Sequence, residues 1–273
     1  MHIPRPPHWL IYAGLVAVIL FAASWRQQAN APEAPPPVPG AADMPIAPSS
    51  PFAHGPVAPV RAGSETASGT AFSIGDGGVW LTARHVLDGC SQSAIMVAEG
   101  RGVAAHVSAV RGDVAVLTTD GGSPSLTFAI AREPRRGQMA FHLGYPQGRP
   151  GEAVSRLLGQ QTIKMRGRGV PAQTMLAWVE VGRTDGLNGA LAGLSGAPVL
   201  DGMGQVVGVT LAESPRRGRI YSTTPEALRE ALTAAGVKPA PGAVQSVTTD
   251  NYGRVADSLR RDLRVAQVVC LAV

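Results

Sequence analysis

The stretch GLSGAPVLDG, residues 193–202, places Ser195 in a glycine-rich segment that is followed by a proline and an apolar run. Ser195 is either a nucleophile or part of an ordinary turn, and these ten residues fit both readings. A serine hydroxyl becomes a nucleophile at neutral pH when a neighbouring base takes its proton. The rest of the chain must therefore supply a histidine, and a carboxylate that orients the histidine.

Three of the six histidines, His85, His106 and His142, lie beyond the N-terminal apolar and proline-rich segments. His85 follows an apolar run and two small residues in VWLTARHV (79–86). His106 and His142 lie in runs of alternating apolar and polar residues, where a histidine usually fills a strand face or lies at the surface. The sequence therefore favours His85 as the base for Ser195.

Asp113 directly precedes the apolar run VAVL (114–117). A charge at the inner start of a buried strand costs free energy unless it is paired, so Asp113 is the expected partner of His85. Asp120, at the other end of the run, is expected in a solvated turn. Asp88 is close to His85 in the chain, but a short turn would direct its carboxylate away from the ring.

The segments SGTAFSI…VWLTARHV, DVAVL, LGYPQG and GLSGAPVLDGMGQVVGV occur in this order and resemble the trypsin-like (chymotrypsin-fold) serine endopeptidases, in their short bacterial form related to the HtrA proteases. The resemblance covers about residues 68–231. It implies an all-β fold of two six-stranded antiparallel β-barrels packed at right angles, with the active site between them and helices near the C-terminus. The residues after the helix expected near 224–236 are too few for a PDZ domain.

The resemblance also implies a role for each site residue. His85 acts as general base, Asp113 orients its ring, Ser195 is the nucleophile, and the backbone N–H groups of Gly193 and Ser195 form the oxyanion hole. Leu194 stands where many digestive relatives carry an acid that pairs with a newly cleaved N-terminus, so no such activation is expected. Ala197 replaces the usual second glycine.

The resemblance implies that the primary pocket is lined by NGALA (188–192) and GVTLA (208–212), and neither segment carries a charge. This predicts preference for a small or medium apolar side chain before the scissile bond. The residues expected to bind that side chain are Ala190, Leu191, Val209, Thr210 and Leu211.

Short apolar or alternating runs separated by Gly, Pro and Asp turns predict strands rather than βαβ units. GTAFSI and VWLTA flank GDGG (75–78) and predict a hairpin with glycines at positive φ. Apolar spacing predicts helices over 224–237 and 251–265, and the tail VAQVVCLAV is expected to add a strand or pack on the barrel. Further strands are expected at 93–98, 103–110, 114–118, 138–143, 153–163, 174–183, 197–200, 205–212 and 219–222.

The run WLIYAGLVAVILFAAS (9–24) contains no charge and fits both a signal-peptide core and a membrane anchor. Its tryptophan and its length favour an uncleaved anchor, which would place the rest of the chain outside the cytoplasm. Ten prolines in residues 31–60 predict an extended stalk, with a proline-docking ligand as the alternative. The expected organisation is an anchor or signal peptide (1–25), a linker (26–62), a protease domain (63–240) and a C-terminal helix and strand (241–273).

The chain carries a formal net charge of +5, but its arginines are scattered and no nucleic-acid motif is present. We expect solvated surface charge, no nucleic-acid partner and no cofactor. The spacing of Cys and His matches no zinc site. Two cysteines in an oxidising compartment suggest one bridge between Cys90 and Cys270, and two buried thiols are the alternative.

The sequence thus predicts a serine endopeptidase that acts on polypeptides outside the cytoplasm, on the periplasmic face of the inner membrane or after secretion. Two alternatives remain at this point. One is an inactive homologue that uses the same cleft as a binding module, and the other is an esterase that uses the same triad.

Overall fold

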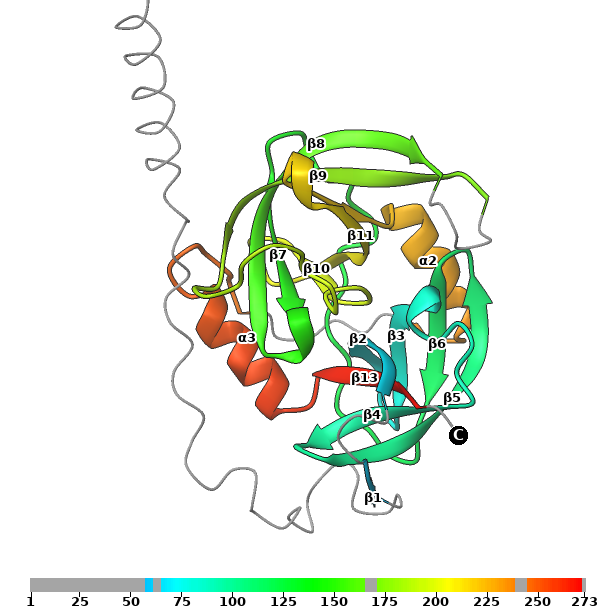
Figure 1. The fold of residues 1–273 in the computed structure, drawn as a ribbon. Coiled ribbons are helices and arrows are strands. Elements are labelled where there is room, and N and C mark those ends of the chain that lie inside the picture. The colour runs from blue at the N-terminus through cyan, green and yellow to red at the C-terminus, as the bar shows by residue number, and fades with distance from the viewer. Residues whose placement is uncertain (1–56, 61–64, 165–170, 239–244, 272–273) are drawn as a thin grey trace, which may run out of the picture.

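The computed structural model describes residues 57–60, 65–164, 171–238 and 245–271, which form two closed antiparallel barrels and two α-helices (Figure 1). The strands are β1 (Val57–Pro59), β2 (Glu65–Gly75), β3 (Val79–Ala83), β4 (Gln92–Ala98), β5 (Arg101–Arg111), β6 (Val114–Thr118), β7 (Met139–Gly144), β8 (Gly151–Ile163), β9 (Gln173–Arg183), β10 (Pro198–Leu200), β11 (Val206–Ser214), β12 (Arg219–Ser222) and β13 (Val265–Leu271). The helices are α2 (Pro225–Ala234) and α3 (Tyr252–Arg261), and single 3₁₀ turns are η1 (Arg84–Val86), η2 (Pro146–Gly148) and η3 (Pro215–Arg217).

Six strands close the first barrel in the order β2, β3, β6, β5, β4, β13, and β1 adds to β5 outside this ring. The predicted hairpin is confirmed, since β2 pairs with β3 and the turn glycines Gly77 and Gly78 have φ of +87° and +95°. Those values suit glycine because it has no Cβ to clash with the backbone. The end of β3 and the start of β6 lie side by side, and these two points carry His85 and Asp113.

The second barrel closes in the order β7, β8, β9, β12, β11, β10. Its strands match the predicted runs to within two residues at each end. The loop before β10 carries Ser195, so the second barrel supplies the candidate nucleophile and the first supplies the candidate base. Both six-stranded barrels of the expected fold are therefore present.

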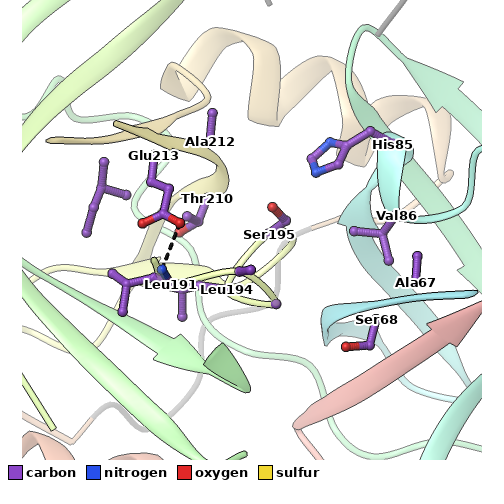
Figure 2. A pocket seen from close by; sticks show the side chains of 13 residues that line it. Ala67, Ser68, His85, Val86, Leu191, Leu194, Ser195, Thr210, Ala212 and Glu213 are labelled. Atoms are coloured by element: carbon purple, nitrogen blue, oxygen red, sulfur yellow. Dashed lines mark hydrogen bonds between the residues drawn. The ribbon is translucent and has the colours of Figure 1, made fainter. Parts of the chain in front are cut away.

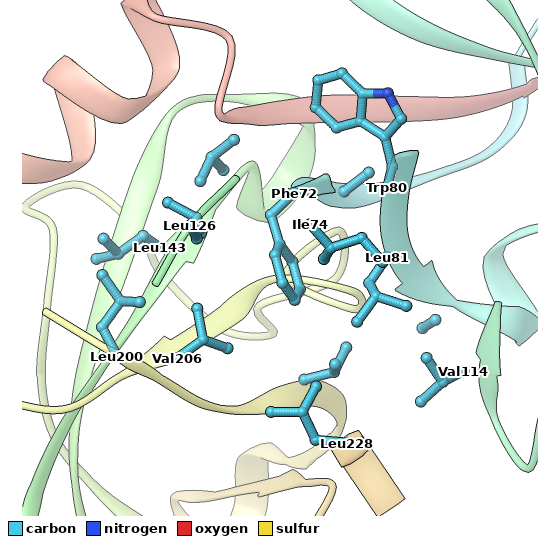
Figure 3. Close-up of a cluster of buried hydrophobic side chains, with 14 of the residues drawn as sticks. Phe72, Ile74, Trp80, Leu81, Val114, Leu126, Leu143, Leu200, Val206 and Leu228 are labelled. Atoms are coloured by element: carbon cyan, nitrogen blue, oxygen red, sulfur yellow. The ribbon is translucent and has the colours of Figure 1, made fainter. Parts of the chain in front are cut away.

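One buried cluster runs through both barrels and reaches the helices (Figure 3). Phe72, Trp80 and Leu81 enter it from the first barrel, Leu143 and Leu200 from the second. Leu228 of α2 is fully buried against it, as the four-residue apolar spacing of that helix predicts. Because the two barrels share one core, their facing loops are held in a fixed relation.

The C-terminal segment completes the first barrel. Strand β13 inserts between β2 and β4 (Figure 1). Cys270 on β13 forms a disulfide with Cys90, 180 residues earlier in the sequence. The expected bridge is thus present, and of the two roles expected for the tail, the added strand is confirmed. The tail therefore ties the segment that follows His85 to the barrel wall.

The predicted anchor or signal peptide (1–25) lies outside the described residues, as does the proline-rich linker (26–62) apart from β1 and Val60. Within the described part of the chain, no helix has the length and apolar character needed to cross a membrane.

Candidate active site

His85 lies on η1, the 3₁₀ turn directly after β3. Its ring Nδ1 is 2.9 Å from Oδ2 of Asp113, and its backbone N–H donates to Oδ1 of the same carboxylate at 3.2 Å. The Asp113 side chain is fully buried, whereas 13% of the His85 side chain is exposed. An Nδ1–H that donates to Asp113 leaves Nε2 unprotonated, which is the tautomer that a general base requires.

The backbone of Asp113, as well as its side chain, is fixed by hydrogen bonds. The carbonyl oxygen of Asp113 accepts from the N–H of Arg84 at 2.9 Å, and a turn at Gly112, with φ of +57°, leads into β6. Asp88, by contrast, forms an exposed pair with Arg84 at 3.5 Å, as expected for a residue outside the site. The carboxylate of Asp113 and the imidazole of His85 therefore form one ordered pair.

The Ser195 loop depends on two glycines. Gly193 and Gly196 have φ of +97° and +89°, and a Cβ at either would clash with a facing backbone oxygen, of Tyr145 and of Thr70 respectively. L-residues rarely adopt this backbone region, so both positions require glycine. Ser195 is held between them in a sharp turn ahead of β10.

The peptide between Ala192 and Gly193 is oriented by η2. The backbone N–H of Gln147 donates to the carbonyl of Ala192, and Gln147 does not line the pocket that contains Ser195. Because the C=O and N–H of a trans peptide point in opposite directions, the Gly193 N–H points away from Gln147. Gly193 itself lines the pocket that contains Ser195. The side-chain amide of Gln147 also donates to the carbonyls of Asn188 and Ala190, at 2.7 and 2.8 Å.

His85 and Ser195 line the same pocket, a cavity of about 260 Å³ at the junction of the two barrels (Figure 2). Gly193, Leu191 and Thr210, three of the residues that the sequence placed at the site, also line it. The other lining residues are Ala67, Ser68, Val86, Ala192, Leu194, Ala212, Glu213 and Ile220.

Three expected pocket residues do not line it. Val209 and Leu211 are fully buried in the main core, and Ala190 is exposed beside the loop, where its carbonyl bonds to Gln147. The physical reason is the alternation of side chains along β11, because a strand that directs Thr210 to the pocket directs Val209 and Leu211 to the opposite face. The register shift between Thr210 and Ala212 then brings Glu213, the partner of Ile220, to the same face as Thr210, the partner of Ser222.

The pocket also carries a charge, contrary to the prediction from 188–192 and 208–212. Glu213, one residue beyond the second segment, lines it and accepts a hydrogen bond from the N–H of Leu191 at 2.7 Å (Figure 2). Burial raises the pKa of the Glu213 carboxyl, while the Leu191 N–H and Arg183 act in the opposite direction. Sequence reasoning missed this residue because it stopped at Ala212.

Thr70 on β2 is a second residue that sequence reasoning missed. Its hydroxyl donates to the carbonyl of Gly193 at 2.8 Å and accepts from the N–H of Tyr145 at 3.0 Å, and its own N–H donates to the carbonyl of Ser195 at 2.8 Å. It is fully buried. One threonine thus joins the first barrel to the Ser195 loop and to η2.

Replacing Thr70 by valine, which keeps the shape and removes the hydroxyl, is expected to lower kcat about tenfold with little change in KM, because the Gly193 peptide loses its support. Thr70→Ser should recover most of the loss, since serine restores the hydroxyl. Steady-state kinetics of the three proteins provide the measurement. Equal kcat values for Thr70→Val and the unaltered chain would show that the hydroxyl does not position the loop.

The other two domain histidines have the structural roles that the sequence favoured. His106 is exposed on β5. His142 is fully buried, with Nδ1 2.9 Å from the Thr210 hydroxyl and Nε2 2.8 Å from the Ser155 hydroxyl. Burial lowers the pKa of His142 to about 3, so its ring is neutral at pH 7 and supports the second barrel.

Leu194 is buried in a cluster of the second barrel together with Leu191, Trp178 and Ile220. The residue before Ser195 is therefore anchored by apolar packing. In the part of the chain that the structure describes, no group of three or more His, Cys, Asp or Glu side chains is arranged to hold a metal ion.

Solved structures share this architecture. The active form of the Rv3671c protease from M. tuberculosis is 21% identical, with a TM-score of 0.53 and coverage of 78% of this chain and 91% of that one. The HtrA-type protease AlgW, solved with a decapeptide, is 20% identical, with a TM-score of 0.50 and coverage of 62% and 51%. At these identities the likeness concerns the fold alone.

No curated protein matches the sequence. The family model described as a trypsin-like peptidase domain matches residues 69–209, which include His85, Asp113 and Ser195 and make up more than half of the chain. The chain belongs to the family of trypsin-like peptidase domains.

Proposed function

We propose that this chain is a serine endopeptidase that cleaves polypeptides through His85, Asp113 and Ser195 and an acyl-enzyme intermediate. The observation that carries the proposal is the 2.9 Å contact between His85 Nδ1 and the buried Asp113 carboxylate, at a ring that shares its pocket with Ser195. Family membership supports a polypeptide substrate.

In the first half of the reaction, Ser195 Oγ attacks the carbonyl carbon of the scissile peptide while His85 Nε2 takes the hydroxyl proton. The carbonyl oxygen becomes an oxyanion, which accepts hydrogen bonds from the N–H groups of Gly193 and Ser195. Asp113 stabilises the imidazolium that forms. His85 then gives its proton to the leaving amine, the C–N bond breaks, and the acyl group stays on Ser195 as an ester.

In the second half, a water molecule gives a proton to His85 and attacks the ester carbonyl. A second oxyanion forms in the same hole, and the C–O bond to Ser195 breaks as His85 returns the proton to Oγ. The product acid leaves, and the enzyme regains its starting state.

We also propose that the domain acts outside the cytoplasm, on the periplasmic face of the inner membrane or after secretion. The disulfide between Cys90 and Cys270 supports this location, since such bonds persist in oxidising compartments. The uncharged apolar run at residues 9–24 supports it independently, as an anchor or a signal peptide.

A fluorophosphonate probe tests the proposal, because it reacts covalently with a serine that an adjacent base has activated. The full chain is expected to be labelled, and labelling should fall below detection in Ser195→Ala and His85→Ala. His106→Ala, which removes an exposed histidine, is the matched control and should label at the unaltered rate.

Folded protein that takes up no label would sink the endopeptidase proposal and leave the binding module as the better reading. Labelled protein that hydrolyses simple esters and cleaves no peptide in a diverse library would instead identify an esterase. Thermal unfolding of each variant establishes that the protein was folded when it was tested.

A further inference from the structure

We propose that Glu213 makes the primary pocket selective for a lysine or arginine side chain immediately before the scissile bond. The inference rests on the proposed endopeptidase function and assigns the substrate class of that site. It replaces the expectation of an apolar side chain, which the sequence suggested.

Glu213 faces the pocket because of its place in the sheet. It is the cross-strand partner of Ile220 on β12, and directly opposed residues point to the same face of a sheet. Both residues line the cavity next to Ser195, and Figure 2 shows the Glu213 side chain reaching from β11 toward Leu191 on the opposite wall. The carboxylate is thus part of the wall that meets the substrate.

The charge of Glu213 is not neutralised by its neighbours. Oε1 accepts from the Leu191 N–H, and among the described residues the carboxylate has no other hydrogen bond. Arg183 is near enough to affect the pKa of Glu213, but its guanidinium is bound by both oxygens of Glu180 and donates to two loop carbonyls. Among the described residues, no lysine or arginine lies within ion-pair distance of Glu213.

Apolar side chains line part of the pocket together with this carboxylate. Leu191, Ala212 and Ile220 contribute its walls beside Glu213. Lysine and arginine side chains combine a methylene stem, which packs on apolar walls, with a cation at the tip. A purely apolar substrate side chain would bury the carboxylate further without giving it a partner, which costs free energy. An ammonium or guanidinium group at the tip of the substrate side chain compensates for the hydration that the Glu213 carboxylate loses, because it pairs with that carboxylate.

Peptidyl phosphonates that differ in one side chain test this inference without requiring turnover. Two are compared: one with lysine before the reactive phosphorus, and one with norleucine, which has the same stem and no charge. We expect the lysine compound to inactivate the unaltered chain about 10- to 100-fold faster, the range for one charge-assisted hydrogen bond. Glu213→Gln should bring the ratio close to one.

Glutamine is the informative replacement because its carbonyl still accepts from the Leu191 N–H, so the loop keeps its support. Glu230→Gln, the same change of charge at an exposed position on α2, is the control and should leave the ratio unchanged. The rate of labelling by a simple fluorophosphonate, which has no such side chain, is measured for each protein, and the lysine-to-norleucine ratio is taken within that protein.

An unaltered chain that takes the fluorophosphonate label but reacts with norleucine as fast as with lysine overturns the assignment of Glu213. A lysine preference that persists in Glu213→Gln overturns it as well. A chain that takes no fluorophosphonate label fails at the proposed function itself, and the inference falls with it.

Discussion

Asp113→Asn is expected to lower kcat by about four orders of magnitude, with KM changed only a few-fold. The reason lies in the two contacts of the Asp113 carboxylate. Oδ1 accepts the backbone N–H of His85, and Oδ2 meets ring Nδ1. An asparagine has one oxygen for these two positions, and the backbone N–H can only donate.

The asparagine oxygen must therefore face the His85 backbone, and its NH₂ must face Nδ1. Nδ1 then has to accept, so the ring proton moves to Nε2. A ring that already carries its proton at Nε2 cannot take one from Ser195. The loss of rate thus follows from the wrong tautomer, while the pocket that binds substrate stays intact.

Rates of peptide cleavage and of fluorophosphonate labelling provide the measurement, and both should fall together. Asp88→Asn is the matched control, since Asp88 lies three residues after His85 and forms only an exposed pair with Arg84. Exposed pairs contribute little, so its activity should stay within about twofold. An Asp113→Asn protein with a tenth or more of the original kcat would contradict the assigned role.

The parts of the fold that the sequence predicted correctly are those that depend on local patterns. Short runs ended by Gly, Pro and Asp marked the strands, because turns need residues that adopt unusual φ or stop a ladder. The pair His85 and Asp113 was also predictable, since each adjoins an apolar run and a buried charge needs a partner. The structure confirms that the two side chains are in contact.

The parts that the sequence could not predict depend on contacts between distant segments. Nothing in residues 265–271 indicates that this strand inserts between β2 and β4. The role of Thr70 likewise arises only when β2, η2 and the Ser195 loop meet. The pocket walls were predicted wrongly at Val209 and Leu211, which alternate with Thr210 along β11 and face the core, and Glu213 was missed because a bulge after Thr210 turns it toward the pocket.

Arg260 on α3 is a further residue with no sequence signal, since in the chain it is one of several arginines on a predicted helix. In the fold it is almost fully buried, with Nη2 2.5 Å from Glu152 Oε1 and 2.6 Å from Asp257 Oδ1. Burial alone lowers the pKa of Arg260, but the Glu152 and Asp257 carboxylates outweigh it and raise the pKa. The guanidinium therefore stays charged.

Arg260→Met is expected to reduce the free energy of unfolding by about 3–5 kcal/mol, the cost of leaving a buried charge without its partner. Glu152 is the source of this cost, because it is 1% exposed and, among the described residues, its carboxylate keeps only the hydrogen bond from the Thr184 hydroxyl. Urea unfolding of the purified chain measures the change. Arg254→Met removes an exposed arginine from the same helix and should cost about 0.5 kcal/mol or less.

Adding Glu152→Gln to Arg260→Met should recover part of the loss, because a neutral amide replaces the unpaired carboxylate and still accepts from Thr184. A double variant as unstable as Arg260→Met would instead assign the cost to lost packing of the arginine stem.

Arg260 also contacts the segment that supports the Ser195 loop. Its Nη1 donates to the carbonyl of Gly144 at 3.2 Å, shortly before η2, where the Gln147 N–H donates to the Ala192 carbonyl. Variants that fold at the assay temperature should therefore lose kcat in parallel with stability, since α3 also supports the turn that holds the proposed oxyanion loop.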